Sequence, residues 1–286
     1  MTFYLFLALS VCLSAARNLI TKRTAIGTNK SRSDFFLLQT VLFSSAAILL
    51  LPFSISIWPS ISQSTVFYGL LYGVLLVASQ WMLTLALKSG RTSVCSAVYA
   101  MGFIFPTLSG TLFWNEPFRR TEAVGLAVIV FVILLSVGKS GSRKETGRSF
   151  GAFLLIAMLA SGGLGIMQKI QQSSEARDEK SAFLVIAFAL ASVVSFLAFL
   201  WTGKKTKPTP LLLCCASATG LCFGGANLCN TVLAGMKNSA IVFPLQNIGT
   251  IFLSTVLGLI VFREKITPRI LFTLALSFAA IMLFSI

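Results

Sequence analysis

The stretch LALKSGRTSVCSAVYAMGFIFPTLSGTLFWNE, residues 85–116, aligns without a gap with LAGMKNSAIVFPLQNIGTIFLSTVLGLIVFRE, residues 233–264, so that Glu116 matches Glu264. Each copy begins at the end of one apolar segment and passes through a short polar turn. It then continues as a second apolar segment that stops at the glutamate, and one further apolar segment follows. The alignment therefore predicts a duplicated chain whose two halves share one order of helices.

The composition indicates an integral membrane protein. The chain has 286 residues, of which 56% are hydrophobic and 11% are charged, and its mean hydropathy is +0.88. A soluble domain carries about 25% charged residues, so too few polar side chains remain here to cover a surface in contact with water. Apolar runs of about 20 residues, each long enough to cross a bilayer as a helix, recur along the chain. We therefore expect a multi-pass protein of the cell membrane, with the lipid bilayer as a partner.

The apolar runs and the polar breaks between them predict an all-α protein with ten transmembrane helices. A first five-helix repeat would occupy residues 1–140 and a second residues 141–286, joined at a basic break that contains glycines. Because five is an odd number, the second repeat would enter the membrane from the opposite side, which makes the repeat inverted. Repeated halves of this kind are typical of membrane transporters. The predicted spans cover residues 2–20, 35–52, 65–87, 92–114, 121–138, 150–170, 181–201, 211–234, 239–262 and 268–286.

Two glycine pairs support the duplication. Gly69 and Gly73 lie one helical turn apart in the third predicted helix, and Gly220 and Gly224 repeat the spacing in the eighth. Glycines at this spacing let helix backbones approach closely, which is a common packing device inside membranes. We expect both pairs to lie at contacts between helices.

The formal net charge of +15 does not indicate nucleic-acid binding, because the Lys and Arg residues lie in short clusters between apolar runs rather than on one soluble face. Such clusters are typical of the positive-inside bias of cytoplasmic loops, and their distribution favours termini outside the cytoplasm. The six cysteines lie inside apolar runs without metal-ligand spacing, and the sequence contains no histidine. We therefore expect no metal site and no cofactor.

Together these features resemble the drug/metabolite transporter superfamily, EamA type. The residues that carry the resemblance are Glu116 at the end of the fourth predicted helix, Gly125-Leu126-Ala127 at the opening of the fifth, and Glu264 in the second copy. The family usually has glycine before the helix-end glutamate, where this chain has Asn115 and Arg263. The resemblance implies alternating access through a central cavity between the two repeats, with a small-molecule substrate. It leaves the oligomeric state open, a homodimer included.

Polar side chains inside apolar spans supply the candidate substrate-binding residues. Such side chains are costly in a bilayer and usually face the bundle interior or a cavity. Amides concentrate on the third, eighth and ninth predicted helices, although single amides also serve simply to hydrogen-bond neighbouring helices. Arg17 could reach the membrane interface or anchor a carboxylate or phosphate. The predicted substrate-binding residues are Gln80, Tyr99, Asn227, Asn230, Gln246, Asn247 and Arg17.

No Asp, Glu or His residue lies in the middle of a predicted span. All eight Asp and Glu residues lie at turns or helix ends, which disfavours proton relays and a buried anion for lipophilic cations. Glu116 and Glu264 are expected to bind Arg119 or Lys265, and Lys169 is expected at the membrane interface. The sequence contains no acidic or histidine-rich cluster of the kind that a membrane enzyme needs.

The expected substrate is an amino acid or a nucleobase-like compound. Export of drug-like cations and flipping of a lipid or lipid-linked sugar are the alternatives.

Overall fold

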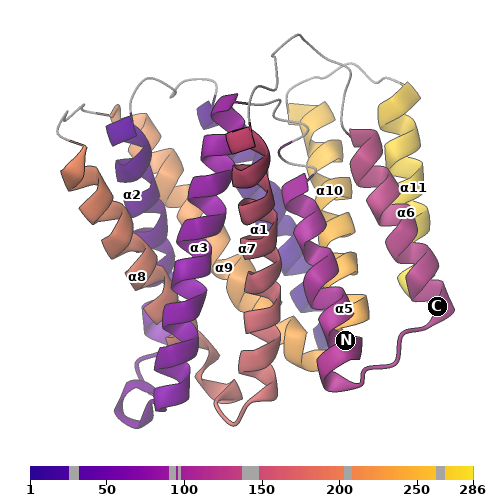
Figure 1. Ribbon diagram of the computed structural model, residues 1–286, viewed down its shortest axis with the longest axis horizontal. Helices are drawn as coiled ribbons and strands as arrows, with labels where there is room; N and C mark the ends of the chain where they lie inside the picture. Colours follow the sequence, from indigo (N-terminus) through magenta and orange to yellow (C-terminus); the bar gives the residue numbers. More distant parts are fainter. Residues whose placement is uncertain are drawn as a thin grey trace. The chain divides into compact units, whose positions relative to one another are not determined.

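The computed structural model describes residues 1–25, 32–89, 95, 98–136, 148–202, 208–261 and 268–285, and every regular element within these ranges is a helix (Figure 1). The predicted all-α class is confirmed for these residues. The α-helices are α1 (Thr2–Ala25), α2 (Arg32–Leu50), α3 (Gln63–Ser89), α5 (Ile104–Trp114), α6 (Arg120–Ser136), α7 (Arg148–Ser173), α8 (Lys180–Trp201), α9 (Pro210–Met236), α10 (Ser239–Val261) and α11 (Pro268–Ser285). The short 3-10 helices are η1 (Leu51–Phe53), η2 (Trp58–Ser60), η3 (Met101–Phe103) and η4 (Arg177–Glu179).

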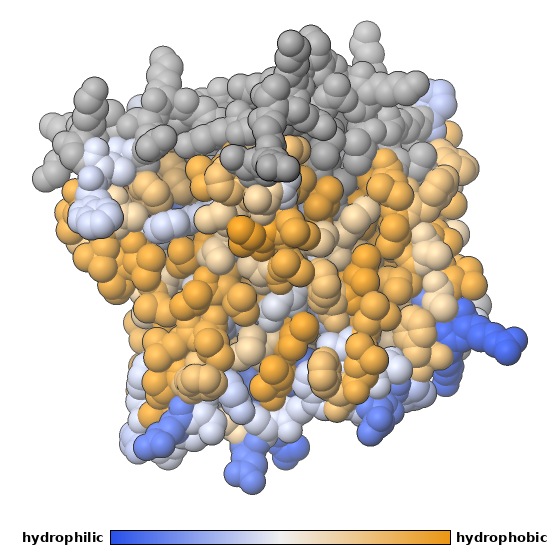
Figure 2. Space-filling model, in the orientation of Figure 1, coloured by the Kyte–Doolittle hydropathy of each residue, from blue (hydrophilic) through white to orange (hydrophobic). Residues whose placement is uncertain are grey.

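The described helices have the composition of membrane-spanning segments. Seven of them are long and apolar enough to cross a membrane. Helix α6 has 17 residues, and the apolar stretches Val98–Trp114 and Ile270–Phe284 are also shorter than those seven. Hydrophobic side chains cover much of the face shown in Figure 2, and large ones such as Phe67 and Leu112 are exposed. This surface fits a membrane protein, while the count of ten spans stays a prediction.

The region predicted as one helix over 92–114 is interrupted where the structure describes it. The 3-10 helix η3 precedes α5, which begins at Ile104. Pro106 has no backbone N–H and its ring crowds the carbonyl one turn earlier. It is therefore well placed in the first turn of α5 and disfavours a continuous α-helix through Gly102.

The chain forms two compact units, and each unit contains helices from both halves of the sequence. Unit 1 comprises Met1–Val77 and Ile170–Leu233, and unit 2 comprises Ala78–Lys169 and Ala234–Ile286. This division follows compactness and differs from a division into repeats. The predicted repeat boundary after residue 140 lies outside the described residues and stays a prediction.

In unit 1, helices α2 and α8 pack along each other (Figure 1). The hydroxyl groups of Ser44 in α2 and Ser192 in α8 share a hydrogen bond of 2.6 Å. These serines are separated by 148 positions, which is also the offset between Glu116 and Glu264. The glycine pairs of α3 and α9, which lie between these serines and the aligned stretch, are offset by 151 positions instead. The ungapped alignment therefore does not extend to Ser44 and Ser192.

Both predicted glycine pairs lie at helix contacts within unit 1. A side-chain carbon at Gly73 of α3 would lie 2.8 Å from the carbonyl oxygen of Ala187 in α8. One at Gly220 of α9 would collide with the carbonyl of Leu42 in α2, and Gly224 faces the same helix. The pattern is reciprocal, since α3 turns its glycines toward α8 and α9 turns its glycines toward α2. The expectation that these glycines allow close helix approach is confirmed.

In unit 2, α5 packs against α10 and α6 packs against α11. Gly125 of α6 faces the ring of Phe284 in α11, and Gly165 of α7 faces Pro106 at the start of α5. The pairs α5–α10 and α6–α11 each join one helix from the first predicted repeat with one from the second. Unit 2 thus repeats the kind of pairing that α2 and α8 make in unit 1.

Candidate functional site

Helices α1 and α9 of unit 1 meet along a polar seam that includes two of the predicted binding residues. The hydroxyl of Ser10 donates a hydrogen bond to Oδ1 of Asn230. Two turns further along α1, the guanidinium carbon of Arg17 lies 3.8 Å from the centroid of the Phe223 ring. Residue numbers rise along α1 as they fall along α9, so the two helices run antiparallel here. The α1–α9 seam consists of Ser10, Leu13, Arg17, Phe223, Gly225 and Asn230.

Arg17 gives the α1–α9 seam a positive charge. Its side chain is half-buried and stacks on an aromatic face, which stabilises a desolvated cation through the negative face of the ring. A guanidinium presents five N–H donors in a planar fork that matches carboxylate and phosphate oxygens. The seam therefore combines a cation, an amide and a hydroxyl, a set that suits a small polar or zwitterionic molecule.

Asn227, one turn from Phe223 on α9, is held by protein partners. The hydroxyl of Tyr72 in α3 donates to its Oδ1 at 2.6 Å, and its Nδ2 donates to the carbonyl of Phe223 at 2.8 Å. The side chain is only 6% exposed. Asn227 therefore fixes α3 to α9, which is the interhelical role that single amides commonly have.

The other predicted binding residues belong to unit 2. Nε2 of Gln80 in α3 lies 3.4 Å from the hydroxyl of Tyr99, and Gln80 is 7% exposed. Gln246 and Asn247 are half-buried in α10, within the turn that follows Pro244. The structure therefore brings Gln80 together with Tyr99, and it brings Arg17 and Asn230 into one seam in unit 1. Whether these residues bind a substrate stays a prediction.

A buried charged cluster in unit 2 joins the ends of four helices, and the sequence analysis did not predict it. Nζ of Lys169 in α7 lies 2.5 Å from Oε1 of Glu116, and both side chains are 10% exposed. The second carboxylate oxygen of Glu116 accepts the N–H of Ser239, the first residue of α10, at 2.6 Å. Lys169 also donates to the carbonyl of Ala234 near the end of α9 at 3.2 Å. We call Glu116, Lys169, Ala234 and Ser239 the charged cluster.

Local backbone geometry aims Glu116 into the charged cluster. Asn115 adopts the left-handed conformation with φ of 51° and ends α5 by donating its N–H to the carbonyl of Gly110. Asparagine tolerates this conformation better than most residues other than glycine. A side chain at Gly110 would collide with the Glu116 carboxylate. Asn115 therefore orients the Glu116 carboxylate, and Gly110 leaves the space that this carboxylate occupies.

One expectation about this region is wrong. Glu116 binds Lys169 and Ser239 rather than Arg119, because the turn after α5 directs its carboxylate toward α7 and α10. Lys169 is buried in the protein at 8% exposure, and its position relative to the membrane interface stays a prediction. A signal was available, since a lysine inside a long apolar helix usually has a specific partner. The counterpart Glu264 lies outside the described residues.

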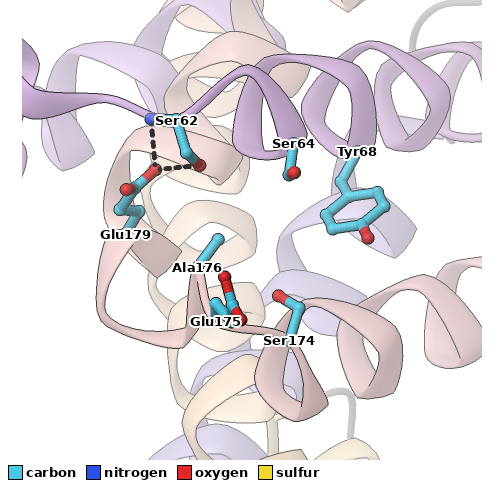
Figure 3. A pocket seen from close by; sticks show the side chains of 7 residues that line it. All are labelled: Ser62, Ser64, Tyr68, Ser174, Glu175, Ala176 and Glu179. Carbon is cyan, nitrogen blue, oxygen red and sulfur yellow. Dashed lines mark hydrogen bonds between the residues drawn. The ribbon is translucent and has the colours of Figure 1, made fainter.

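A polar pocket of about 300 Å³ lies in unit 1, where the start of α3 meets the turn between α7 and α8 (Figure 3). The backbone N–H and the hydroxyl of Ser62 donate to Oε2 of Glu179 at 3.0 and 2.9 Å, so the two walls are bonded to each other. The sequence analysis did not predict this pocket, although three of the eight acidic residues lie in its 175–179 turn. The lining residues are Ser62, Ser64, Tyr68, Ser174, Glu175, Ala176 and Glu179.

No family model matches the chain. Among solved structures, the chain is similar to a crystal structure described only as that of a protein, with a TM-score of 0.82 and 13% sequence identity. The match covers 99% of this chain and 96% of that chain. At this identity the similarity shows that the two chains share a fold along nearly their whole length.

Proposed function

We propose that the chain is a multi-pass membrane transporter of the drug/metabolite type. It moves a small polar metabolite, such as an amino acid or a nucleobase-like compound, by alternating access of two inverted five-helix repeats. The apolar all-helical architecture is the setting that this function requires, since polar solutes need a protein pathway through lipid.

The observation that carries the proposal is the reciprocal packing in unit 1. In a twofold arrangement, a residue touches its own counterpart only beside the axis, and every other contact occurs twice with the partners exchanged. The glycines of α3 against α8 and those of α9 against α2 have the second form, since Gly69 and Gly73 correspond to Gly220 and Gly224. These contacts support a duplication with a twofold relation between its halves, and repeated halves are a common construction of transporters.

The polar groups of the α1–α9 seam support a small polar substrate. Asn230 and Arg17 are only half-buried, whereas Asn227 is buried and bonded through both ends of its amide. Because Ser10 is fully buried, a substrate that takes its place at Asn230 must also give the Ser10 hydroxyl a partner, as a polar or zwitterionic group can. Asn230 and Arg17 are therefore the predicted binding residues on which we place the substrate contact in unit 1, and Asn227 positions α9.

Thermal unfolding of the purified protein against a metabolite panel tests the proposal. The panel comprises amino acids, nucleobases, sugars, phosphorylated compounds and quaternary ammonium ions. A ligand that binds only the folded state stabilises it by about 2.7 kcal/mol at 100 times its Kd, which is readily seen as a shift in Tm. We expect a shift with one class of amino acid or nucleobase, lost in Asn230→Ala.

Asn18→Ala is the matched control, because Asn18 is an exposed asparagine on α1 next to Arg17. This variant is expected to keep the ligand-induced shift. A response to quaternary ammonium ions that depends on Asn230 would instead favour export of drug-like cations. Silence across the panel, combined with lipid transfer between leaflets in vesicles, would favour a flippase.

A further inference from the structure

The polar pocket of unit 1 has a lining whose only charges are negative. Glu175 and Glu179 contribute carboxylates, and neither Lys nor Arg lines it. Arg177, in the same turn, forms an exposed ion pair with Asp178, and its Nε lies 4.0 Å from Oδ2 of Asp178. A cavity with two carboxylates and no cation on its walls attracts a positively charged occupant.

The two carboxylates have different surroundings. Oε2 of Glu179 accepts two hydrogen bonds from Ser62, so this carboxylate braces the pocket wall. Glu175 is exposed at the opposite wall, and in Figure 3 it lies beside the Ser174 hydroxyl, on the side of the pocket that faces Ser64. Glu175 is thus the acidic group available to an occupant.

The wall that holds Glu175 is itself supported from within unit 1. Nε2 of the buried Gln171 donates to the carbonyl of Ala176 at 2.8 Å, and Nε2 of Gln172 donates to the carbonyl of Arg177 at 3.1 Å. Two amide side chains of α7 therefore hold the turn that presents Glu175. Such bracing keeps the carboxylate in place before any occupant arrives, which lowers the entropic cost of binding.

The volume of the pocket and its other lining residues indicate which kind of cation fits it. A volume of about 300 Å³ lies at the small end of ligand pockets in proteins and exceeds the space that one bare metal ion occupies. Calcium takes six to eight oxygen ligands at about 2.3–2.6 Å, and the described residues contain no group of three acidic or metal-binding side chains. The Tyr68 ring adds an aromatic surface (Figure 3), which favours an organic ammonium group.

We propose that this pocket binds a small organic ammonium ion, with Glu175 opposite its charge, Tyr68 against its methyl or methylene groups, and the Ser64 and Ser174 hydroxyls accepting its N–H or C–H groups. The lining residues of the pocket lie at the start of α3, just after α7 and in the turn before α8. It is separate from the α1–α9 seam, and its occupancy is independent of whether the chain transports anything.

Equilibrium binding of radiolabelled choline to the full chain in lipid nanodiscs tests the proposal. We expect saturable binding that Glu175→Gln weakens by about fivefold, the size of one partly exposed charge contact, and that rising salt also weakens. Tyr68→Phe is expected to keep the affinity, while Tyr68→Leu lowers it severalfold because the aromatic face is lost. The unliganded Tm of Glu175→Gln should equal that of the wild type, since Glu175 is exposed.

Two controls separate this site from its neighbours. Asp178→Asn removes a carboxylate from the same turn that does not line the pocket and is expected to leave choline binding unchanged. Asn230→Ala alters the α1–α9 seam and is also expected to leave it unchanged. The proposal is overturned if choline does not bind at tens of millimolar, if Asp178→Asn weakens binding as much as Glu175→Gln does, or if Asn230→Ala alone removes it. Displacement of choline by calcium at equal concentration would overturn it as well, in favour of a mineral cation.

Discussion

The α1–α9 seam of unit 1 and the charged cluster of unit 2 both place polar groups inside apolar helices, but these groups have different kinds of partner in the two regions. In the seam, an amide meets a hydroxyl and a guanidinium meets an aromatic ring. In the cluster, a full carboxylate meets an ammonium group and a backbone N–H at the start of a helix. Separating a neutral hydrogen-bonded pair costs less than opening a buried ion pair, which leaves an unpaired charge.

The comparison assigns different roles to the two regions. Under the proposed function, the seam is the part that contacts a substrate, and the cluster is the part that holds α5, α7, α9 and α10 together. Substitutions in the cluster should therefore lower stability strongly, and substitutions in the seam should lower ligand binding with little loss of stability.

The largest effect is expected for Lys169→Met. This change leaves the Glu116 carboxylate buried without its ammonium partner, and breaking a buried pair costs about 3–5 kcal/mol. Denaturant unfolding in detergent measures the free energy, and the double variant Lys169→Met with Glu116→Gln should recover a large part of the loss. Lys237→Met, at an exposed lysine, is the control and should change stability by about 0.5 kcal/mol or less. Equal effects at the two lysines would show that the ion pair contributes nothing specific.

A smaller difference is expected between two glycines, one in each region. Gly110→Ala would press a methyl group against Glu116 and lie 2.8 Å from Cβ of Ser239, so we expect a loss of about 1–3 kcal/mol. Gly225→Ala meets only the end of the Leu13 side chain at 2.9 Å, which can rotate away. Its cost should be offset by the higher helix propensity of alanine, about 1 kcal/mol.

Gly151→Ala provides the baseline for both glycine variants, because nothing lies within 4 Å of a side chain at that position. Unfolding free energies of the three variants should follow the order Gly151→Ala, Gly225→Ala, Gly110→Ala, from most to least stable. A Gly225→Ala protein as unstable as Gly110→Ala would mean that the seam is packed as rigidly as the cluster, and the proposed difference in roles would not hold.

The smallest effect on stability is expected at Ser10 and Asn230. Hydrogen bonds between membrane helices contribute about 0.6 kcal/mol on average, so Ser10→Ala and Asn230→Ala should each lower the unfolding free energy by less than about 1 kcal/mol. Only Asn230→Ala should remove the response to the panel ligand. If both variants keep that response, the substrate contact does not lie at this end of the seam.

Periodicity and composition were sufficient to predict most of the fold. Apolar runs predicted a helix at the place of each described α-helix of ten or more residues, and the glycine spacing predicted the close contacts of Gly73 and Gly220. The break before α5 was missed because a continuous apolar run hides the effect of Pro106 on the turn preceding it. A local hydrophobic pattern does not report where a backbone hydrogen bond is lost.

Partners of polar side chains were harder to predict than their presence. Asn227 and Asn230 are nearly adjacent on α9, yet one binds Tyr72 of α3 and the other Ser10 of α1. Lys169 and Glu116 are 53 positions apart, and their pairing depends on the left-handed turn at Asn115 and on how α7 passes the end of α5. Sequence identifies such groups by their cost in lipid, but only tertiary packing decides which groups meet.

Solute counterflow in proteoliposomes tests the central claim, transport of a small polar metabolite, most directly. Vesicles loaded with one unlabelled amino acid or nucleobase are diluted into the labelled compound, and uptake is compared among wild type, Asn230→Ala, Asn18→Ala and protein-free vesicles. We expect saturable uptake for at least one compound with wild type and Asn18→Ala, and a severalfold or greater loss with Asn230→Ala. Uptake by wild type equal to that of protein-free vesicles for every amino acid and nucleobase would contradict the account.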